Sequence, residues 1–463
     1  MKILGKIKNV IGISLLIILA GYILTFTNCS LFDDPEPDIT TPGNALTNYL
    51  NNEDTTYQWE VVTTYNILDV AAYDLLLTSQ QWREYTWKHQ LTILIPPDIQ
   101  FDESLLWITG GSLKDGTPNW ASTNDEETWT LGILAGSYNT IVAILRQTPN
   151  QPLYDNLKED ALISYTLNSY QNDGDYTWPL LFPMVKGAVR AMDAVQEFSQ
   201  ETIDQEISGF LISGASKRGW TTWLTGAVDS RVVAIAPAVI DVLNMPVNLD
   251  YQLEVWGDYS VEIQDYVDLG IPQTVNTDQG DDIATMIDPY SYRNKLTMPK
   301  LILIGTNDPY WPVDAIKHYL NDLQGENYIH YVANAGHDLN GGQQALRCVG
   351  AFMGHTFAQI PYRECEWDVT ESGTGITLSV EGTTNIVKAA YLWMANSEDR
   401  DFRDEVWNST QINTVNNSTA DITITYPDTG FRAFYIDLEY TDIIGRNYTK
   451  STRMFVADDD EIL

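Results

Sequence analysis

Short apolar runs alternate with longer amphipathic stretches through the middle of the chain. The runs have the length and continuous apolar character of strands that are buried on both faces of a parallel sheet. Residues 183–198 and 217–228, which lie between such runs, repeat apolar positions at helical spacing. Strands that alternate with helices predict an α/β sandwich of three layers around a mostly parallel sheet. The expected strands are residues 91–97, 104–111, 139–147, 208–214, 231–239 and 300–308.

The pattern changes twice in the second half of the chain. Over 242–297 the alternation gives way to an aromatic and acidic stretch, for which we expect helices that cover the sheet as a cap. Over 367–463 the apolar runs are rich in β-forming residues and are separated by Gly, Asn, Asp and Ser, with no helix-length pattern between them. This predicts a β-sandwich domain of the immunoglobulin or fibronectin III type, which follows an α/β domain over 44–366.

Composition and charge narrow the class of protein. A chain of 463 residues is long enough for two or three folded units, and 44% hydrophobic residues with 14 Trp and 26 Tyr exclude a disordered chain. The formal charge at pH 7 is -37, and no segment gathers Lys or Arg into a basic stripe. Such a charge repels phosphate backbones, which argues against nucleic acid as a partner, and we expect the acidic residues to serve solubility.

The first residues predict export. Three lysines precede an apolar run over residues 10–26, which is the order of charge and hydrocarbon in an export signal. Cys29 ends this segment and is followed by the acidic, proline-containing stretch DDPEPD, as in a bacterial lipoprotein. We therefore expect a signal peptide over 1–28, a tether over 29–43 and a lipid anchor at Cys29 in a membrane of the bacterial envelope. A cleaved, free periplasmic or extracellular protein and an uncleaved membrane anchor are the alternatives.

Cys348 and Cys365 are the cysteines beyond the export segment. In an exported protein they could form a disulfide that closes a loop of modest length. Two unpaired, buried thiols are the alternative. Neither cysteine has the CxxC spacing of a metal or redox site, and the sequence indicates no metal and no cofactor.

The stretch ISGASKRGW, residues 212–220, contains the candidate nucleophile, Ser216. A serine hydroxyl becomes reactive when a tight turn between a strand and a helix presents it to an imidazole. Small residues before Ser216 let strand and helix approach closely, and a helix that begins at Lys217 directs its amide groups at a developing oxyanion. The glycine expected two residues after the serine is delayed to Gly219, so a simple helix-capping serine is the alternative.

The order nucleophile, acid, histidine is that of α/β-hydrolases. Asp308 ends one apolar strand and His337 ends another, and the separations leave room for a cap, one strand and one helix. A turn-initiating aspartate and a surface-loop histidine are the plainer interpretations of these two residues. Asp241, which closes the strand before the cap, is the rival for the acid.

An oxyanion hole needs two donors. The backbone N–H of Lys217 is the expected first donor, because it follows the nucleophile. Gly110 and Gly111, which follow an early strand, are the expected second source, although a flexible turn would also place glycines there. The ammonium group of Lys217 could assist the same oxyanion.

Five segments, taken in order, resemble the PhoPQ-activated pathogenicity-related proteins, an exported family with an α/β-hydrolase-like fold. The most specific segment, GASKRGW, is also similar to the G-C-S-R-x-G-K elbow of glucuronoyl esterases, in which an arginine at the position of Lys217 assists the oxyanion. The resemblance implies that the delayed Gly219 is a family trait, and it leaves the substrate open. The segments are SQQWREYTWKHQLTILIPP, LLWITGGS, PMVKGAVRAMDAVQEF, GASKRGWTTWLTGAVDSRV and NAGHDLNGG.

The sequence therefore predicts an exported, lipid-anchored serine hydrolase that acts on a small-molecule or polysaccharide-borne ester without a cofactor. Ser216 would attack the carbonyl, His337 would transfer the proton, and Asp308 would orient the imidazole. One alternative is a signalling or binding protein that keeps the fold without turnover. A second is a carbohydrate-binding or adhesion protein that acts through residues 367–463.

Overall fold

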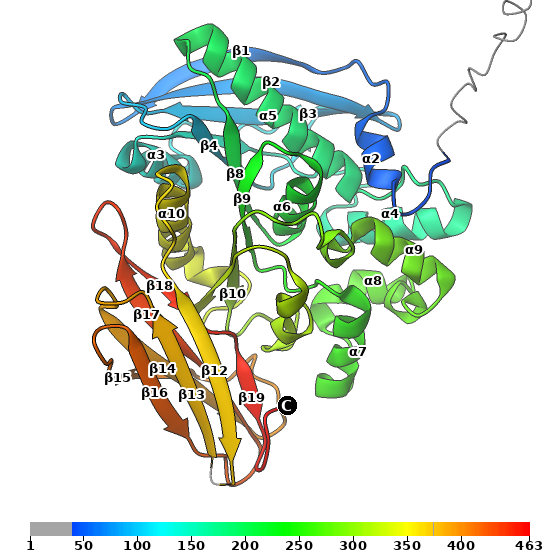
Figure 1. Ribbon diagram of the computed structural model, residues 1–463. Coiled ribbons are helices and arrows are strands. Elements are labelled where there is room, and N and C mark those ends of the chain that lie inside the picture. Colours follow the sequence, from blue (N-terminus) through cyan, green and yellow to red (C-terminus); the bar gives the residue numbers. More distant parts are fainter. Residues whose placement is uncertain (1–38, 374) are drawn as a thin grey trace, which may run out of the picture. The chain divides into compact units, whose positions relative to one another are not determined.

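The computed structural model describes residues 39–373 and 375–463 (Figure 1). The expected signal peptide, Cys29 and most of the expected tether lie outside these residues, so those expectations stay predictions. Residues Pro42–Leu463 form one compact unit. In the part of the chain that the structure describes, no helix has the length and apolar character needed to cross a membrane.

A large mixed sheet runs through this unit in the order β1-β2-β3-β7-β4-β8-β9-β10-β11. The strands from β7 to β11 in this order pair in parallel, which confirms the predicted α/β class. Their bounds are β1 Gln58–Ile67, β2 Val70–Trp82, β3 Tyr85–Ile95, β4 Glu103–Ile108, β7 Ile141–Leu145, β8 Gly209–Ala215, β9 Val232–Ala238, β10 Lys300–Gly305 and β11 Asn327–Val332.

The first three strands differ from the expectation for a parallel sheet. Residues 91–97 fall largely in β3, but β3 runs antiparallel to both β2 and β7. For β2 and β3 the reason is the short connection from Trp82 to Tyr85, because so few residues between two strands permit only an antiparallel hairpin.

Helices cover both faces of the sheet and make the three predicted layers. On strand β8, Phe210 and Ile212 face the core shared with α5 and α6, whereas Leu211 faces the core shared with α3 and α10. This alternation follows from the two-residue period of a strand. The helices are α3 Glu126–Tyr138, α5 Leu181–Ile203, α6 Lys217–Val228 and α10 Gln343–Phe357.

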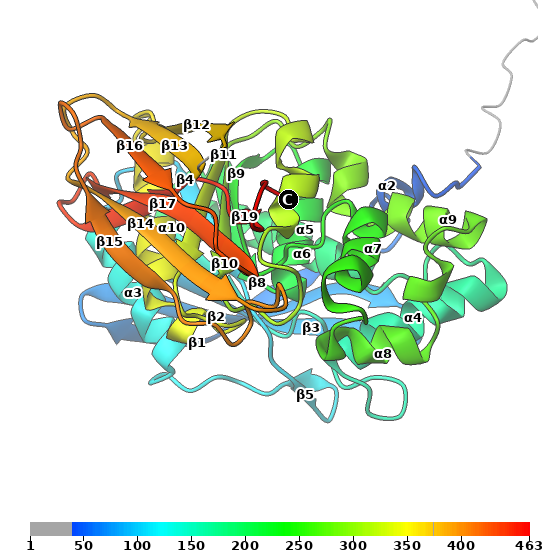
Figure 2. The same cartoon turned by 90° about the horizontal axis from the view of Figure 1, so that it is seen from below.

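The interval between β9 and β10 is helical, as expected for a cap. Figure 2 shows α7, α8 and α9 on the same side of the unit as α4, and α4 contacts α8 directly. The elements are α4 Glu159–Asp173, α7 Met245–Trp256, η1 Val261–Ile263, α8 Gln264–Asp268, η2 Pro272–Thr274, α9 Asp278–Ile287 and η3 Pro289–Tyr292. Smaller elements elsewhere are α2 Ala45–Leu50, β5 Leu113–Lys114, β6 Thr117–Pro118, η4 Ala315–His318, η5 Leu320–Asp322 and η6 Leu339–Gly341.

The C-terminal strands form the predicted sandwich of two antiparallel layers. One layer is β12-β13-β16, and the other is β18-β17-β14-β15 with β19 on β17. Ser451 of β18 pairs with Ile329 of β11, so this second layer continues the central sheet. The strands are β12 Cys365–Ser372, β13 Gly375–Gly382, β14 Ala389–Ser397, β15 Asn408–Ile412, β16 Thr419–Ile424, β17 Phe431–Thr441, β18 Asn447–Ser451 and β19 Phe455–Ala457.

The disulfide between Cys348 and Cys365 is absent, which corrects that expectation: both are unpaired, buried thiols. Each sulfur instead points to a carbonyl oxygen of β18, from Cys348 Sγ to Thr449 O at 3.7 Å and from Cys365 Sγ to Lys450 O at 3.9 Å. Burial raises the pKa of each thiol to about 12, so both stay protonated and unreactive.

Candidate active site

Ser216 sits on the turn between β8 and α6 in a strained backbone conformation. Its φ is 57° and its ψ is -125°, in a region that residues with a side chain rarely adopt. The backbone N–H of Ser216 donates to Ala238 O at the end of β9, at 2.9 Å. Although Ser216 occupies the N-cap position, its side chain makes no capping hydrogen bond. The hydroxyl is therefore not used as a helix cap.

Two glycines make this turn compact. A Cβ on Gly214 would stand 2.9 Å from backbone atoms of Arg218, and a Cβ on Gly219 would stand 2.8 Å from Ala238 O. Because side chains at these positions would force α6 away from β8 and β9, both residues must be glycine for the turn to close. The delayed glycine at 219 thus serves the approach of the helix to the sheet.

His337 and Asp308 meet at the ends of neighbouring strands. His337 Nδ1 lies 2.8 Å from Asp308 Oδ2, and the other carboxylate oxygen accepts a hydrogen bond from Tyr310 N at 3.0 Å. The ring of Tyr310 packs on the imidazole, with centroids 4.2 Å apart. These contacts fix both the plane and the tautomer of His337, because a carboxylate can only accept the Nδ1 proton.

Ser216 and His337 line the same cavity. His337 Nε2 is buried and has no hydrogen-bond partner among the described residues, so this nitrogen is free to accept a proton from a hydroxyl in the cavity. Almost all of the remaining wall is apolar, and the cap supplies much of it. The apolar lining is Leu167, Trp220, Val239, Ile240, Val242, Met245, Leu249, Ile263, Ile271, Pro272, Ile283, Ile287 and Trp311.

The ammonium group of Lys217 is paired rather than free. Lys217 Nζ lies 2.7 Å from Asp160 Oδ2, at the start of α4. Tyr266, from cap helix α8, donates its hydroxyl proton to the other oxygen of Asp160 at 2.9 Å. Asp160 and Lys217 both line the cavity, so the pair forms its main charged patch. No sequence signal marks Asp160, because an acidic pair at the start of a helix normally serves the helix dipole.

Gly110 and Gly111 lie beside this turn but not on the cavity wall. A Cβ on Gly110 would stand 2.8 Å from Arg218 Nη2, and one on Gly111 would stand 2.9 Å from Gln147 Nε2. Arg218 itself makes a two-pronged ion pair with Glu159, with N–O distances of 2.7 and 2.8 Å. Close packing against Arg218 and Gln147 thus explains why glycine occupies these two positions, and their role in an oxyanion hole stays a prediction.

Asp241 is buried near the site but is not the partner of His337. Burial, reinforced by the nearby negative charges of Asp308 and Asp314, raises the pKa of Asp241 to about 7. The carboxylate that accepts a hydrogen bond from the imidazole is that of Asp308. The geometry therefore favours Asp308 as the acid.

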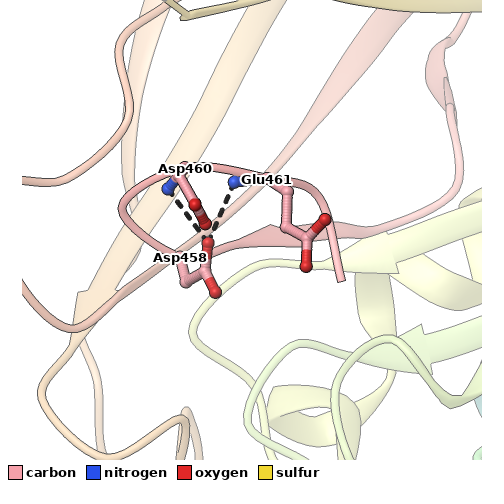
Figure 3. A group of neighbouring side chains, drawn as sticks. All are labelled: Asp458, Asp460 and Glu461. Carbon is pink, nitrogen blue, oxygen red and sulfur yellow. Dashed lines mark hydrogen bonds between the residues drawn. The ribbon is translucent and has the colours of Figure 1, made fainter.

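A cluster of three acidic residues lies far along the chain from the candidate active site. Figure 3 shows Asp458, Asp460 and Glu461 in a turn near the C-terminus, with ligand atoms within 4.8 Å of one another. Asp458 Oδ1 already accepts hydrogen bonds from the backbone N–H groups of Asp460 and Glu461, at 3.0 and 2.9 Å. The carboxylate therefore serves the turn, and the cluster is not evidence of a metal site.

A protein family and a relative of known sequence both match most of the chain. The family described as PhoPQ-activated pathogenicity-related protein matches residues 46–403. Autocrine proliferation repressor protein A of Dictyostelium discoideum is 33% identical over 429 residues, which are 85% of this chain and 85% of that protein.

Solved structures of esterases are also similar to the chain. Acetyl xylan esterase 1 from Thermoanaerobacterium sp. has a TM-score of 0.47 and 15% identity, with 68% of this chain and 93% of that chain covered. A glucuronoyl esterase from Solibacter usitatus has a TM-score of 0.40 and 11% identity, with 68% and 92% covered.

Proposed function

The chain belongs to the PhoPQ-activated pathogenicity-related protein family, and from this premise we propose that it is a serine hydrolase that cleaves carboxylic esters. One observation carries the proposal. The imidazole of His337 is hydrogen-bonded to Asp308 through Nδ1, its Nε2 has no partner among the described residues, and His337 lines a cavity that Ser216 also lines. A hydroxyl, a base and an acid in this relation are the elements of a serine hydrolase triad.

In the first half of the reaction, Ser216 Oγ attacks the ester carbonyl while His337 Nε2 takes its proton. Asp308 stabilises the resulting imidazolium. The backbone N–H of Lys217 lies in the first turn of α6, where amide protons have no partner within the helix, and it would donate to the oxyanion. The C–O bond of the leaving group then breaks, and the imidazolium returns the proton to the departing alcohol.

In the second half, water attacks the acyl group on Ser216. His337 takes a proton from this water and then gives it to Ser216 Oγ, which releases a carboxylic acid. The apolar cavity wall supports a substrate with an apolar group next to the ester, because burying such a group removes hydrocarbon from water. The ester itself would belong to a small molecule or to a polysaccharide substituent.

Labelling by a fluorophosphonate probe tests the proposal. We expect covalent labelling of the full chain and its loss in Ser216→Ala. Ser230→Ala is a matched control, because Ser230 is an exposed serine at the far end of α6. A panel of short acyl esters and uronate esters would then identify the substrate class. Folded wild-type protein that neither reacts with the probe nor cleaves any ester contradicts the proposal.

A protein that keeps the fold without turnover is the second candidate. Two observations favour it: the relative named as a proliferation repressor, and the absence of a hydrogen bond from any described residue to His337 Nε2. This candidate predicts that Ser216 stays unlabelled in folded protein, and that Ser216→Ala keeps whatever biological activity the wild type has.

We also propose export and attachment to an envelope membrane through a lipid on Cys29. The apolar run over residues 10–26 and the cysteine that follows it support this location. Metabolic incorporation of an alkyne fatty acid should label the wild type and not Cys29→Ala. Equal labelling of both proteins, or of neither, contradicts the anchor.

A further inference from the structure

A loop of the C-terminal sandwich reaches the two loops that carry Asp308 and His337. This loop, residues 398–407, connects β14 to β15 and is called the clamp loop below. It contacts the loop after β10, the loop after β11 and the cap helix α7. Three elements that surround the proposed active site are therefore held by one segment that lies outside the α/β part of the chain.

The first contact is made by Asn307, the neighbour of Asp308. Its Nδ2 lies 2.7 Å from Glu405 O and within 3.3 Å of two further carbonyl oxygens, those of Phe402 and Arg403. The Oδ1 atom of the same side chain accepts a hydrogen bond from Thr306 Oγ1 at 2.8 Å. The amide of Asn307 thus fixes the loop after β10 to the backbone of the clamp loop.

The second contact is made by Asn334, three residues before His337. Asn334 Oδ1 accepts from Trp407 N at 2.8 Å, and Asn334 Nδ2 donates to Trp407 O at 3.0 Å. The side-chain amide of Asn334 thus bonds to both backbone groups of Trp407, as the backbone of a neighbouring β-strand would. Asn334 N also donates to Thr306 Oγ1 at 2.8 Å, which joins the two catalytic loops to each other.

The third contact reaches the cap. Arg400 Nη2 donates to the hydroxyl of Tyr251 on α7 at 2.6 Å, and the guanidinium of Arg403 lies 4.1 Å from the ring centroid of Trp256. A movement of the clamp loop would therefore displace the cap as well as the loops that carry Asp308 and His337.

The clamp loop is itself anchored by burial. The side chains of Phe402 and Trp407 are 3% and 2% exposed, and the ring of Trp407 lies 5.8 Å from that of Tyr435 on β17. Two buried aromatic anchors, one in the middle of the loop and one at its end, make the loop rigid, because moving it would expose a large apolar area. The sandwich can thus act as a fixed support for loops that would otherwise be mobile.

We propose that the clamp loop positions Asp308 and His337 for catalysis through the side chains of Asn307 and Asn334. The C-terminal strands are then a working part of the enzyme rather than an independent module. The inference rests on the proposed function, and it makes Asn307 and Asn334 positioning residues, since neither needs to touch the substrate. A displacement of about 1 Å in a catalytic group can cost as much as 100-fold in rate.

Kinetics of Asn307→Ala and Asn334→Gly in the full chain test the proposal. Glycine is chosen at 334 because Asn334 has a φ of 55°, which alanine would strain. Against an ester that the wild type cleaves, we expect kcat to fall about 10- to 100-fold while KM changes by less than about twofold. Asn334→Asp keeps the oxygen that accepts from Trp407 N, so it should restore part of the lost kcat.

Asn396→Ala is the matched control. Asn396 lies on β14, is exposed and accepts a hydrogen bond from Arg432 at 2.8 Å, without contact to the catalytic loops. Its kcat should stay within about twofold of the wild type. Urea unfolding shows whether each variant is folded. Folded Asn307→Ala and Asn334→Gly with unchanged kcat would overturn the proposal, as would an equal loss of kcat in Asn396→Ala.

Hydrogen exchange gives a second readout that needs no activity. In both variants, peptides covering residues 306–310 and 332–338 should exchange at least about tenfold faster than in the wild type and in Asn396→Ala. Unchanged exchange overturns the positioning role. If the wild type proves unreactive toward fluorophosphonate and esters, the proposed function fails, and the exchange experiment still decides whether the clamp loop holds these two loops.

Discussion

Lys217 Nζ lies 2.7 Å from Asp160 Oδ2, so the side chain that follows the candidate nucleophile is held by an ion pair in the wall of the cavity. Both side chains are mostly buried, with exposed fractions of 10% and 16%. Tyr266 joins the pair to the cap through a hydrogen bond to Asp160. One carboxylate thereby connects the helix behind Ser216, the start of α4 and cap helix α8.

Asp160→Asn should destabilise the protein, because it removes the closer carboxylate partner of the largely buried Lys217 ammonium and leaves only Glu159, at 3.6 Å. Breaking a buried ion pair costs about 3–5 kcal/mol, and the partial exposure of this pair puts the expected loss nearer about 2–3 kcal/mol. Urea unfolding measures the loss. Asp98→Asn, the same change at an exposed residue that does not line the cavity, should stay within about 0.5 kcal/mol. Equal stability of both variants would show that the ion pair contributes nothing.

Substitutions of Ser216 should separate catalysis from stability. Ser216→Ala and Ser216→Gly should each lower kcat about 10⁴- to 10⁶-fold, because the nucleophile is gone. Glycine tolerates the positive φ of 57°, whereas alanine keeps the strain. We therefore expect the free energy of unfolding of Ser216→Gly, measured with urea, to exceed that of Ser216→Ala by about 1 kcal/mol. The opposite order would mean that the turn stores no strain at this residue.

Asparagine substitutions should decide which carboxylate is the acid of the triad. Asp308→Asn removes the acceptor of the Nδ1 proton and should lower kcat about 10⁴-fold by favouring the wrong tautomer of His337. Asp241→Asn removes a carboxyl group that is not bonded to the imidazole, so kcat should stay within about fivefold of the wild type. Steady-state kinetics on the two variants check this. A larger loss in Asp241→Asn would make Asp241 the acid instead.

The same Asp241→Asn variant should change how stability depends on pH. Burial raises the pKa of Asp241 from 3.8 to about 7, so between these values the folded protein holds a proton that the unfolded chain has released. The contribution of Asp241 to the free energy of unfolding of the wild type therefore falls as pH rises from 3.8 to about 7. Asp241→Asn lacks this contribution, and its stability relative to the wild type should rise over that interval. Urea unfolding at several pH values measures the difference, and a constant difference contradicts the prediction.

Glycine substitutions should test the geometry of the turn. Gly219→Ala places a Cβ 2.8 Å from both Ala238 O and Ile240 Cγ2, and Gly214→Ala places one 2.9 Å from the Arg218 backbone. Because these neighbours are mostly backbone atoms that cannot move aside, we expect each variant to lose about 1–3 kcal/mol of stability and part of its labelling by fluorophosphonate. Gly43→Ala, where no atom lies within 4 Å of the added Cβ, is the control. Tolerance of alanine at 219 would show that the delayed glycine has no packing role.

The stretch from residue 208 to 228 shows what the local pattern of apolar and small residues can predict. An apolar run followed by small residues and then by helical spacing predicts a strand, a turn and a helix, and the structure has β8, Ser216 and α6 in that order. Long elements of this kind can be predicted because their burial imposes a period of two or 3.6 on the residues themselves. The order of the candidate triad along the chain follows from the same strand assignments.

Other features carry no local signal. The partner of Lys217 is Asp160, a residue that looks like an ordinary helix-start acid, and Cys348 and Cys365 stay apart although their spacing permits a loop. The continuation of the central sheet through Ile329 and Ser451 was equally hidden, because strand neighbours far apart in sequence are chosen by register and space rather than by composition.

The sequence by itself determined the α/β class, the cap, the β-rich end and the candidate residues Ser216, Asp308 and His337, because these depend on short-range periodicity and on the order of strands. The tertiary structure alone decided which carboxylate bonds to His337, that Lys217 forms an ion pair with Asp160, and that Asn307 and Asn334 bind the clamp loop. Hydrogen bonds and ion pairs act over a few ångströms, and only the folded chain brings residues that are tens or hundreds of positions apart within that range.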